Sequence, residues 1–127
     1  MSQPDQLFRQ GQELAMQLFG NPLGDFSDLP INASDDFSKE MVTWVFGYLL
    51  KERSKLPIRV KVLGIIAMSV AIGQYDMLKR WLPAAKNSGC TRQEVHEAII
   101  TMVIYAGWPT GRKGLEILAE HWPNDPA

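Results

Sequence analysis

Residues 87–109 read NSGCTRQEVHEAIITMVIYAGWP, and this stretch decides the fold class. Thr91 and Glu94 have the spacing of a capping box, in which each side chain satisfies a backbone N–H at a helix start. The apolar residues that follow recur at i, i+3, i+4, i+7 and i+8, which is the spacing of one helix face. They are Val95, Ala98, Ile99, Met102 and Val103. The stretch therefore predicts a turn, an amphipathic helix from Thr91, and a break at residues 105–109.

The rest of the chain shows the same helical spacing, and no convincing run alternates with the period of two that strands require. Proline and glycine residues divide it into segments. We predict further helices over Pro4–Phe19, Phe37–Lys51, Tyr75–Asn87 and Gly111–Trp122, and one that Leu56-Pro57 opens and Gly73 ends. The predicted fold is an all-α, single-domain bundle of about six helices that covers residues 1–127.

Composition limits the classes of function. The chain has 127 residues, of which 46% are hydrophobic and 21% charged, with a formal net charge of −1. Such a balance gives no excess charge to attract nucleic acid or an anionic membrane surface, so neither is expected as a partner. The single cysteine, Cys90, excludes an internal disulfide and a CxxC site, and it favours a reducing compartment. With no apolar segment long enough to cross a bilayer, we expect a cytoplasmic protein.

The apolar surface exceeds what one small bundle can hide. Six helices are predicted in so few residues, and two of them, including the one after Pro57, are apolar on more than one face. A second subunit would cover such surface, so we expect a homo-oligomer. A compact monomer with a well-filled core remains the alternative.

From about Leu7 to Trp122, the order of elements resembles the carboxymuconolactone decarboxylase family, an all-helical family that includes the alkylhydroperoxidases. Residues 87–95 and 104–109 are similar to the family segments NNGxTxEEI and IYAGxP at the same separation. Phe46-Gly47, and Leu56-Pro57 before the apolar helix with Lys61, are weaker matches. The resemblance implies either a decarboxylase that acts on a lactone acid or a CxxC peroxidase, both commonly oligomeric.

The chain departs from both branches of that family at the reactive positions. Counted back from Gly89, the family's active-site histidine falls at Trp81, and the acidic residue of decarboxylase-like members falls at Met77. The two cysteines of the peroxidase branch fall at Gln74 and Met77, so no thiolate is present there to attack a peroxide. Peroxidase activity is therefore excluded, and a decarboxylase would take its proton from elsewhere.

Candidate site residues follow from this comparison. Arg59 and Lys61, near the start of a helix, are candidates to hold a substrate carboxylate, or they pair with a neighbouring Asp or Glu. Tyr105, in the family-like Tyr-Ala-Gly segment, is the candidate acid, or it packs and caps a helix end. The predicted catalytic residues are thus Tyr105 and Lys61.

Three further residues are candidates to line the pocket. Trp81 and Met77 are four apart on one helix face, which suits an apolar pocket wall or ordinary core packing. Asp76 lies one residue before the family's acidic position, so it is turned about 100° and is expected to face outward unless it lines the pocket. We find no motif for a cofactor or a metal, and none is expected.

Three functions are compatible with the sequence. The first is a cofactor-independent lyase, or a related isomerase, that acts on a small carboxylated lactone or polyketide-like acid. The second is a catalytically inactive member that binds a small hydrophobic acid, because Trp81 and Met77 replace the reactive pair. The third is an assembly partner for an active paralogue.

Overall fold

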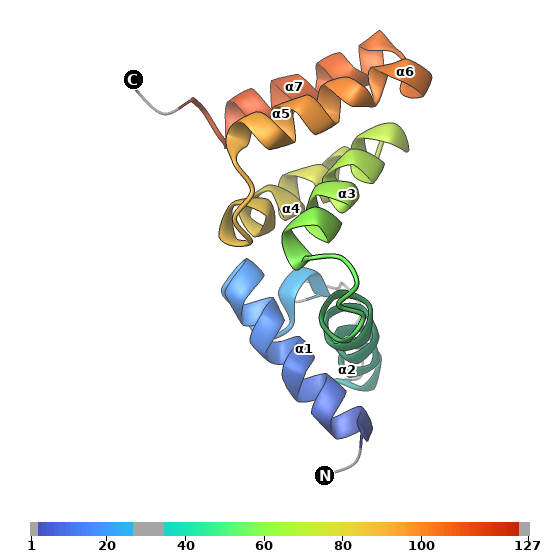
Figure 1. Cartoon of the computed structure of the whole chain (residues 1–127), viewed down its shortest axis with the longest axis vertical. Coiled ribbons are helices and arrows are strands. Elements are labelled where there is room, and N and C mark those ends of the chain that lie inside the picture. The colour runs from blue at the N-terminus through green and yellow to red at the C-terminus, as the bar shows by residue number, and fades with distance from the viewer. Residues whose placement is uncertain (1–2, 27–34, 125–127) are drawn as a thin grey trace. The chain divides into compact units, whose positions relative to one another are not determined.

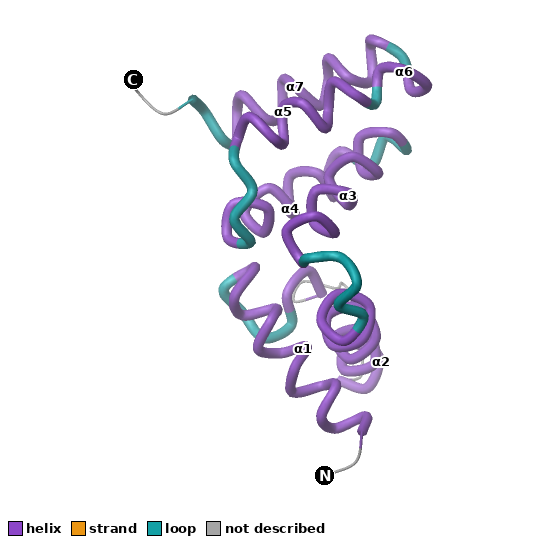
Figure 2. The backbone as a smooth tube through the Cα atoms, viewed as in Figure 1, coloured by secondary structure: helices purple, strands orange, loops and turns teal. Residues whose placement is uncertain are grey.

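The computed structural model describes residues 3–26 and 35–124, and every regular element among them is a helix (Figures 1 and 2). The all-α prediction is therefore confirmed. The chain forms two compact units, Met1–Ile58 and Arg59–Ala127. The single domain over residues 1–127 stays a prediction.

The first unit is built on two long helical segments. Helix α1 covers Gln3–Phe19, as predicted, and a 3₁₀ turn, η1, covers Gly24–Phe26. Helix α2, Asp35–Met41, runs without interruption into η2, Val42–Glu52, which is a π-helix. The predicted single helix over residues 37–51 is thus helical throughout but changes type at residue 42. Apolar spacing cannot show this change, because it depends on which carbonyl each N–H reaches.

The core of the first unit lies where α1 packs on η2. Phe46 is fully buried, and its ring contacts Phe19 and Phe26 edge-on, with ring centroids 5.8 and 5.9 Å apart. Two glycines, Gly11 in α1 and Gly47 in η2, let the two backbones approach closely. The other buried apolar residues of this core are Leu14, Ala15, Leu18, Val42 and Leu50.

The second unit contains five helices among the described residues. They are α3 (Ile58–Ala71, whose first residue closes the first unit), α4 (Tyr75–Asn87), α5 (Arg92–Thr101), α6 (Val103–Ala106) and α7 (Trp108–His121). Helix α7 packs against α4 and α5, and its Gly114 lies against the side chains of Val70 and Ile99. No helix in the described part of the chain has the length and apolar content to span a membrane.

The bounds of α4 match the prediction, and Gly73 and Gly89 end their helices with positive φ angles of 73° and 97°. Glycine adopts such angles without steric cost. The helix after Thr91 was predicted to continue through Val103, but α5 ends at Thr101.

The predicted break at residues 105–109 is wrong for most of its length. Only Gly107 leaves the helical conformation, with a φ of 89°, and α7 begins at Trp108 instead of Gly111. Pro109 occupies the first turn of α7, where the missing N–H of proline has no helical partner to lose.

Candidate functional site

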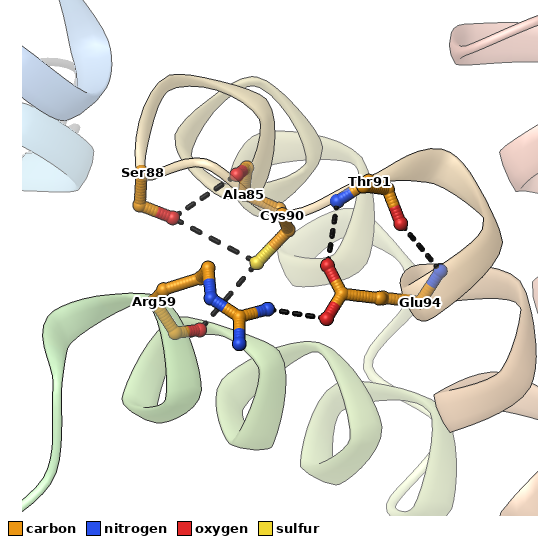
Figure 3. A network of polar contacts seen from close by, with 6 residues as sticks. All are labelled: Arg59, Ala85, Ser88, Cys90, Thr91 and Glu94. Atoms are coloured by element: carbon orange, nitrogen blue, oxygen red, sulfur yellow. Dashed lines mark hydrogen bonds and ion pairs between the residues drawn. The ribbon is translucent and has the colours of Figure 1, made fainter.

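A polar network joins the first turn of α3 to the turn between α4 and α5 (Figure 3). The Arg59 guanidinium forms an ion pair with the Glu94 carboxylate through Nη1 and Oε2. Glu94 also completes the predicted capping box, because its Oε1 accepts the Thr91 N–H at 2.9 Å. The Glu94 N–H in turn donates to Thr91 Oγ1 at 3.0 Å. One carboxylate therefore caps α5 and also binds the start of α3.

The network shifts the pKa values of both charged groups in the direction that keeps them charged. The backbone N–H of Thr91 and then the Arg59 guanidinium lower the pKa of Glu94 below its ordinary value. The hydrogen bond with Glu94 raises the pKa of Arg59. Both side chains are partly open to solvent, with 40% and 37% of their surface exposed, so solvent weakens the pair. The expectation that a neighbouring acid pairs with this basic cluster is confirmed for Arg59.

We expect the Glu94→Gln variant to be less stable than the wild type above pH 4.5, the ordinary pKa of the carboxyl. The lowered folded-state pKa gives stability that is complete above that value and is lost as the pH falls through the folded pKa. The melting temperatures of the wild type and Glu94→Gln should therefore converge as the pH is lowered from about 6 to about 3. The Arg59→Gln variant should keep part of this pH dependence of stability, because the Thr91 N–H is the larger cause of the lowered Glu94 pKa. A gap between wild type and Glu94→Gln that stays constant with pH would contradict this account.

Cys90 belongs to the same network, as a packing residue. Its thiol donates to the Arg59 carbonyl oxygen at 3.4 Å, and Ser88 Oγ lies 3.8 Å from the sulfur. The side chain is buried, and burial raises the pKa of the thiol. A position before a helix N-terminus can lower a thiol pKa, but here burial has the larger effect. Cys90 thus fastens the α4–α5 turn to α3 and is not an activated nucleophile.

The native Cys90 thiol should react with DTNB at pH 8 at least about tenfold more slowly than free glutathione, because reaction needs an exposed thiolate. Denaturant should bring its rate close to that of glutathione. The test records absorbance at 412 nm with and without about 6 M guanidinium. Rapid modification of the native protein would show that this sulfur is accessible.

The structure does not bring Lys61 and Arg59 to one face. Both lie in α3, and a step of two residues along a helix turns a side chain by about 200°. Lys61 is partly buried and shares its face with Ile65, Met68 and Ile72, of which the last two are exposed. One carboxylate is therefore not positioned to bind both cations within a single chain.

Trp81 lies in the core of the second unit, with 4% of its surface exposed, among the buried α4 residues Leu78 and Leu82. Met77 is partly buried one turn earlier, and Asp76 is exposed, which agrees with the expected outward direction. The core-packing alternative therefore describes Trp81. Whether Met77 or Asp76 contacts a ligand stays a prediction.

Tyr105 is fully exposed in α6 and packs against no residue that the structure describes. Neither the expected packing nor a capping role is seen for it. Its neighbours Ile104 and Trp108 are also exposed. Lys61 lies near the start of α3 and Tyr105 lies in α6, so the two predicted catalytic residues come from different helices.

A shallow depression of about 410 Å³ adjoins the Glu94 network. Two carboxylates and no described cation line it, so the depression disfavours an anionic ligand. Its lining residues are Leu63, Thr91, Gln93, Glu94, Glu97, Ala98 and Thr101. Among the residues that the structure describes, no group of three or more His, Cys, Asp or Glu side chains could hold a metal ion.

Comparison with known proteins relates the chain to one family. The model of the carboxymuconolactone decarboxylase family matches residues 38–120, which is more than half of the chain. The chain is also 28% identical over 119 residues to the 4-carboxymuconolactone decarboxylase of Acinetobacter baylyi. That alignment covers 91% of this chain and 87% of the relative.

Proposed function

The chain belongs to the carboxymuconolactone decarboxylase family, and from this premise we propose that it is a cofactor-independent carboxy-lyase, or a related isomerase. The proposed substrate is a small carboxylated lactone or polyketide-like acid. The observation that carries the proposal is the alignment with a 4-carboxymuconolactone decarboxylase over 91% of the chain. Purified protein should release carbon dioxide from 4-carboxymuconolactone, and the release should depend on Lys61.

The proposed reaction consists of three chemical events. The bond between the carboxylate carbon and the ring breaks, its electron pair passes into the conjugated lactone as an enolate, and a proton then joins the carbon skeleton. We assign Lys61 to hold the substrate, because it shares a face of α3 with the apolar residues Ile65 and Met68. That combination suits an acid with an apolar body.

The two remaining polar candidates, Arg59 and Tyr105, have different proposed roles. Arg59 is already paired with Glu94 through Nη1, so its first role is to hold α3 on the α5 cap. Its other guanidinium N–H groups lie on a different face of α3 from Lys61, so we assign Arg59 no contact with the carboxylate that Lys61 of the same chain holds. Tyr105 is the proposed proton donor, because a phenol can give a proton to an enolate and the indole at Trp81 cannot.

Tyr105 needs covered surroundings to act on a bound substrate, and the described residues of its own chain give it none. We propose that a second copy of the chain covers this region in a homo-oligomer. The exposed apolar residues of α3, α6 and the start of α7 support this proposal, because a monomer seldom leaves such side chains open to water. They are Met68, Ile72, Ile104 and Trp108.

Light scattering after size-exclusion chromatography should give a mass of at least twice 14.3 kDa for the wild type. Ile104→Glu should shift the protein toward the monomer, because Ile104 is 72% exposed in the chain and a charge there would be buried only between subunits. Lys113→Glu, on an exposed position of α7, is the matched control and should not change the mass. A monomeric wild type at about 50 μM would refute the proposed assembly.

A second function is supported by the burial of Trp81. Where the family resemblance places a histidine, this chain has a core indole that cannot exchange protons near neutral pH. The alternative is a member that binds a small hydrophobic acid without turning it over. Lys61→Ala would weaken binding under both functions, whereas carbon dioxide would appear only under the first.

A further inference from the structure

A second depression, of about 410 Å³, lies between the last turns of α4 and α7. It shares no residue with the Arg59 network, Lys61 or Tyr105, so it is independent of the proposed lyase site. Its volume is within the range of pockets that hold small molecules. The described residues that line it are Leu82, Pro83, Lys86, His121, Trp122, Pro123 and Asn124.

Trp122 forms one wall of this depression and is held there by contacts within the chain. Its backbone N–H donates to the Leu118 carbonyl at 2.8 Å, and its own carbonyl accepts from Arg92 Nε at 2.6 Å. The Lys86 ammonium lies over the indole, 5.7 Å from the ring centroid. The two hydrogen bonds fix the backbone of Trp122 and the Lys86 contact lies on its ring, so a ligand would meet a residue that is already held in place.

The chemistry of the lining is apolar on its walls and positive at its edge. Leu82 is buried, and Pro83 and Pro123 add rigid apolar surface. Lys86 supplies a full positive charge, and His121 supplies a ring N–H. No carboxylate is among the described lining residues. Glu120 stands outside the lining, although its Oε1 is 4.0 Å from His121 Nε2.

We propose that this depression binds a small organic carboxylate that carries one flat ring. The carboxylate would pair with the Lys86 ammonium, and the ring would lie against the Trp122 indole and the two prolines. Charge selects an anion, and the flat apolar walls select a ring over a simple inorganic ion.

The test is a ¹H–¹⁵N NMR titration of the full chain with benzoate, and with benzamide as a neutral probe of the same shape. The Trp122 indole signal is assigned by its loss in Trp122→Phe. Benzoate should shift the Trp122 indole and Asn124 signals with a Kd on the order of 1 mM, as expected for a ligand of so few atoms. Benzamide should bind at least about tenfold more weakly. Equal affinities, or benzoate shifts that appear only elsewhere in the chain, would overturn the proposal.

Variants then test the residue assigned to the carboxylate. Lys86→Gln should weaken benzoate binding by about tenfold, because one charge-assisted hydrogen bond is lost. Lys113→Gln removes an equal charge from an exposed position of α7 outside the depression and should leave the Kd unchanged. Equal weakening by both changes would indicate a general charge effect and refute the site. The comparison of benzoate with benzamide uses the wild type only, so it holds even if Lys86→Gln unpacks Trp122.

Discussion

Replacing Gly47 with alanine should destabilise the first unit by about 3 kcal/mol or more. A Cβ at this position of η2 would lie 2.1 Å from the carbonyl oxygen of Leu7 and 2.8 Å from its carbonyl carbon. Backbone atoms of α1 cannot swing aside as the end of a flexible side chain can. The two helices would have to separate, and the buried contacts around Phe46 would be lost with them.

Chemical denaturation followed by circular dichroism measures this effect. Gly64→Ala is the matched control, because Gly64 lies in α3 and an added Cβ there meets nothing within 4 Å. Alanine in a helix interior is favoured over glycine by about 0.5–1 kcal/mol, so the control should be slightly stabilised. If both variants unfold at the wild-type midpoint, the close contact of α1 with η2 is wrong.

Lys61→Ala should lower kcat/KM for decarboxylation of the acid substrate by at least about 30-fold. Removing one partner of a desolvated charge pair costs about 2–5 kcal/mol of binding free energy. The lower end applies to Lys61, because this side chain is only partly buried. The loss should fall mainly on KM if Lys61 only binds the carboxylate. It should fall on kcat as well if the ammonium also stabilises the developing charge.

Lys55→Ala is the control for this kinetic experiment. It removes the same charge from an exposed position just before α3, so a general electrostatic effect would change both variants equally. A Lys61→Ala enzyme with wild-type kcat/KM would remove Lys61 from the site. Measurable wild-type turnover in the same assay would keep the proposed reaction in place.

The sequence predicted the local features of the fold well, because local contacts determine them. The Thr91–Glu94 capping box and the bounds of α4 depend on residues within one or two helical turns of each other. The π-helical path of η2 and the start of α7 at Trp108 were missed. Proline within a first helical turn and glycine just before it can mark a start as readily as a break.

Prediction of the site was less complete, because pairing between distant residues has no local signal. Arg59 and Glu94 are 35 positions apart, so the sequence does not show that they pair. It shows only that Glu94, as the third residue of the capping box, turns its carboxylate back toward the start of α5. The burial of Trp81 follows from its place between Leu78 and Leu82 in an amphipathic helix. The complete exposure of Tyr105 was not foreseen, because helical spacing does not show where α6 projects.

The central claim is that this chain removes a carboxylate from a small lactone acid without a cofactor, and release of labelled carbon dioxide tests it most directly. Metal-free, chelator-treated protein is incubated with 4-carboxymuconolactone labelled with ¹³C at the carboxyl carbon, and the gas is followed by membrane-inlet mass spectrometry. The account predicts many equivalents of ¹³CO₂ per chain at a rate that Lys61→Ala sharply reduces. Release no faster than in buffer, from protein of wild-type fold and assembly, would contradict the claim and favour a binding protein.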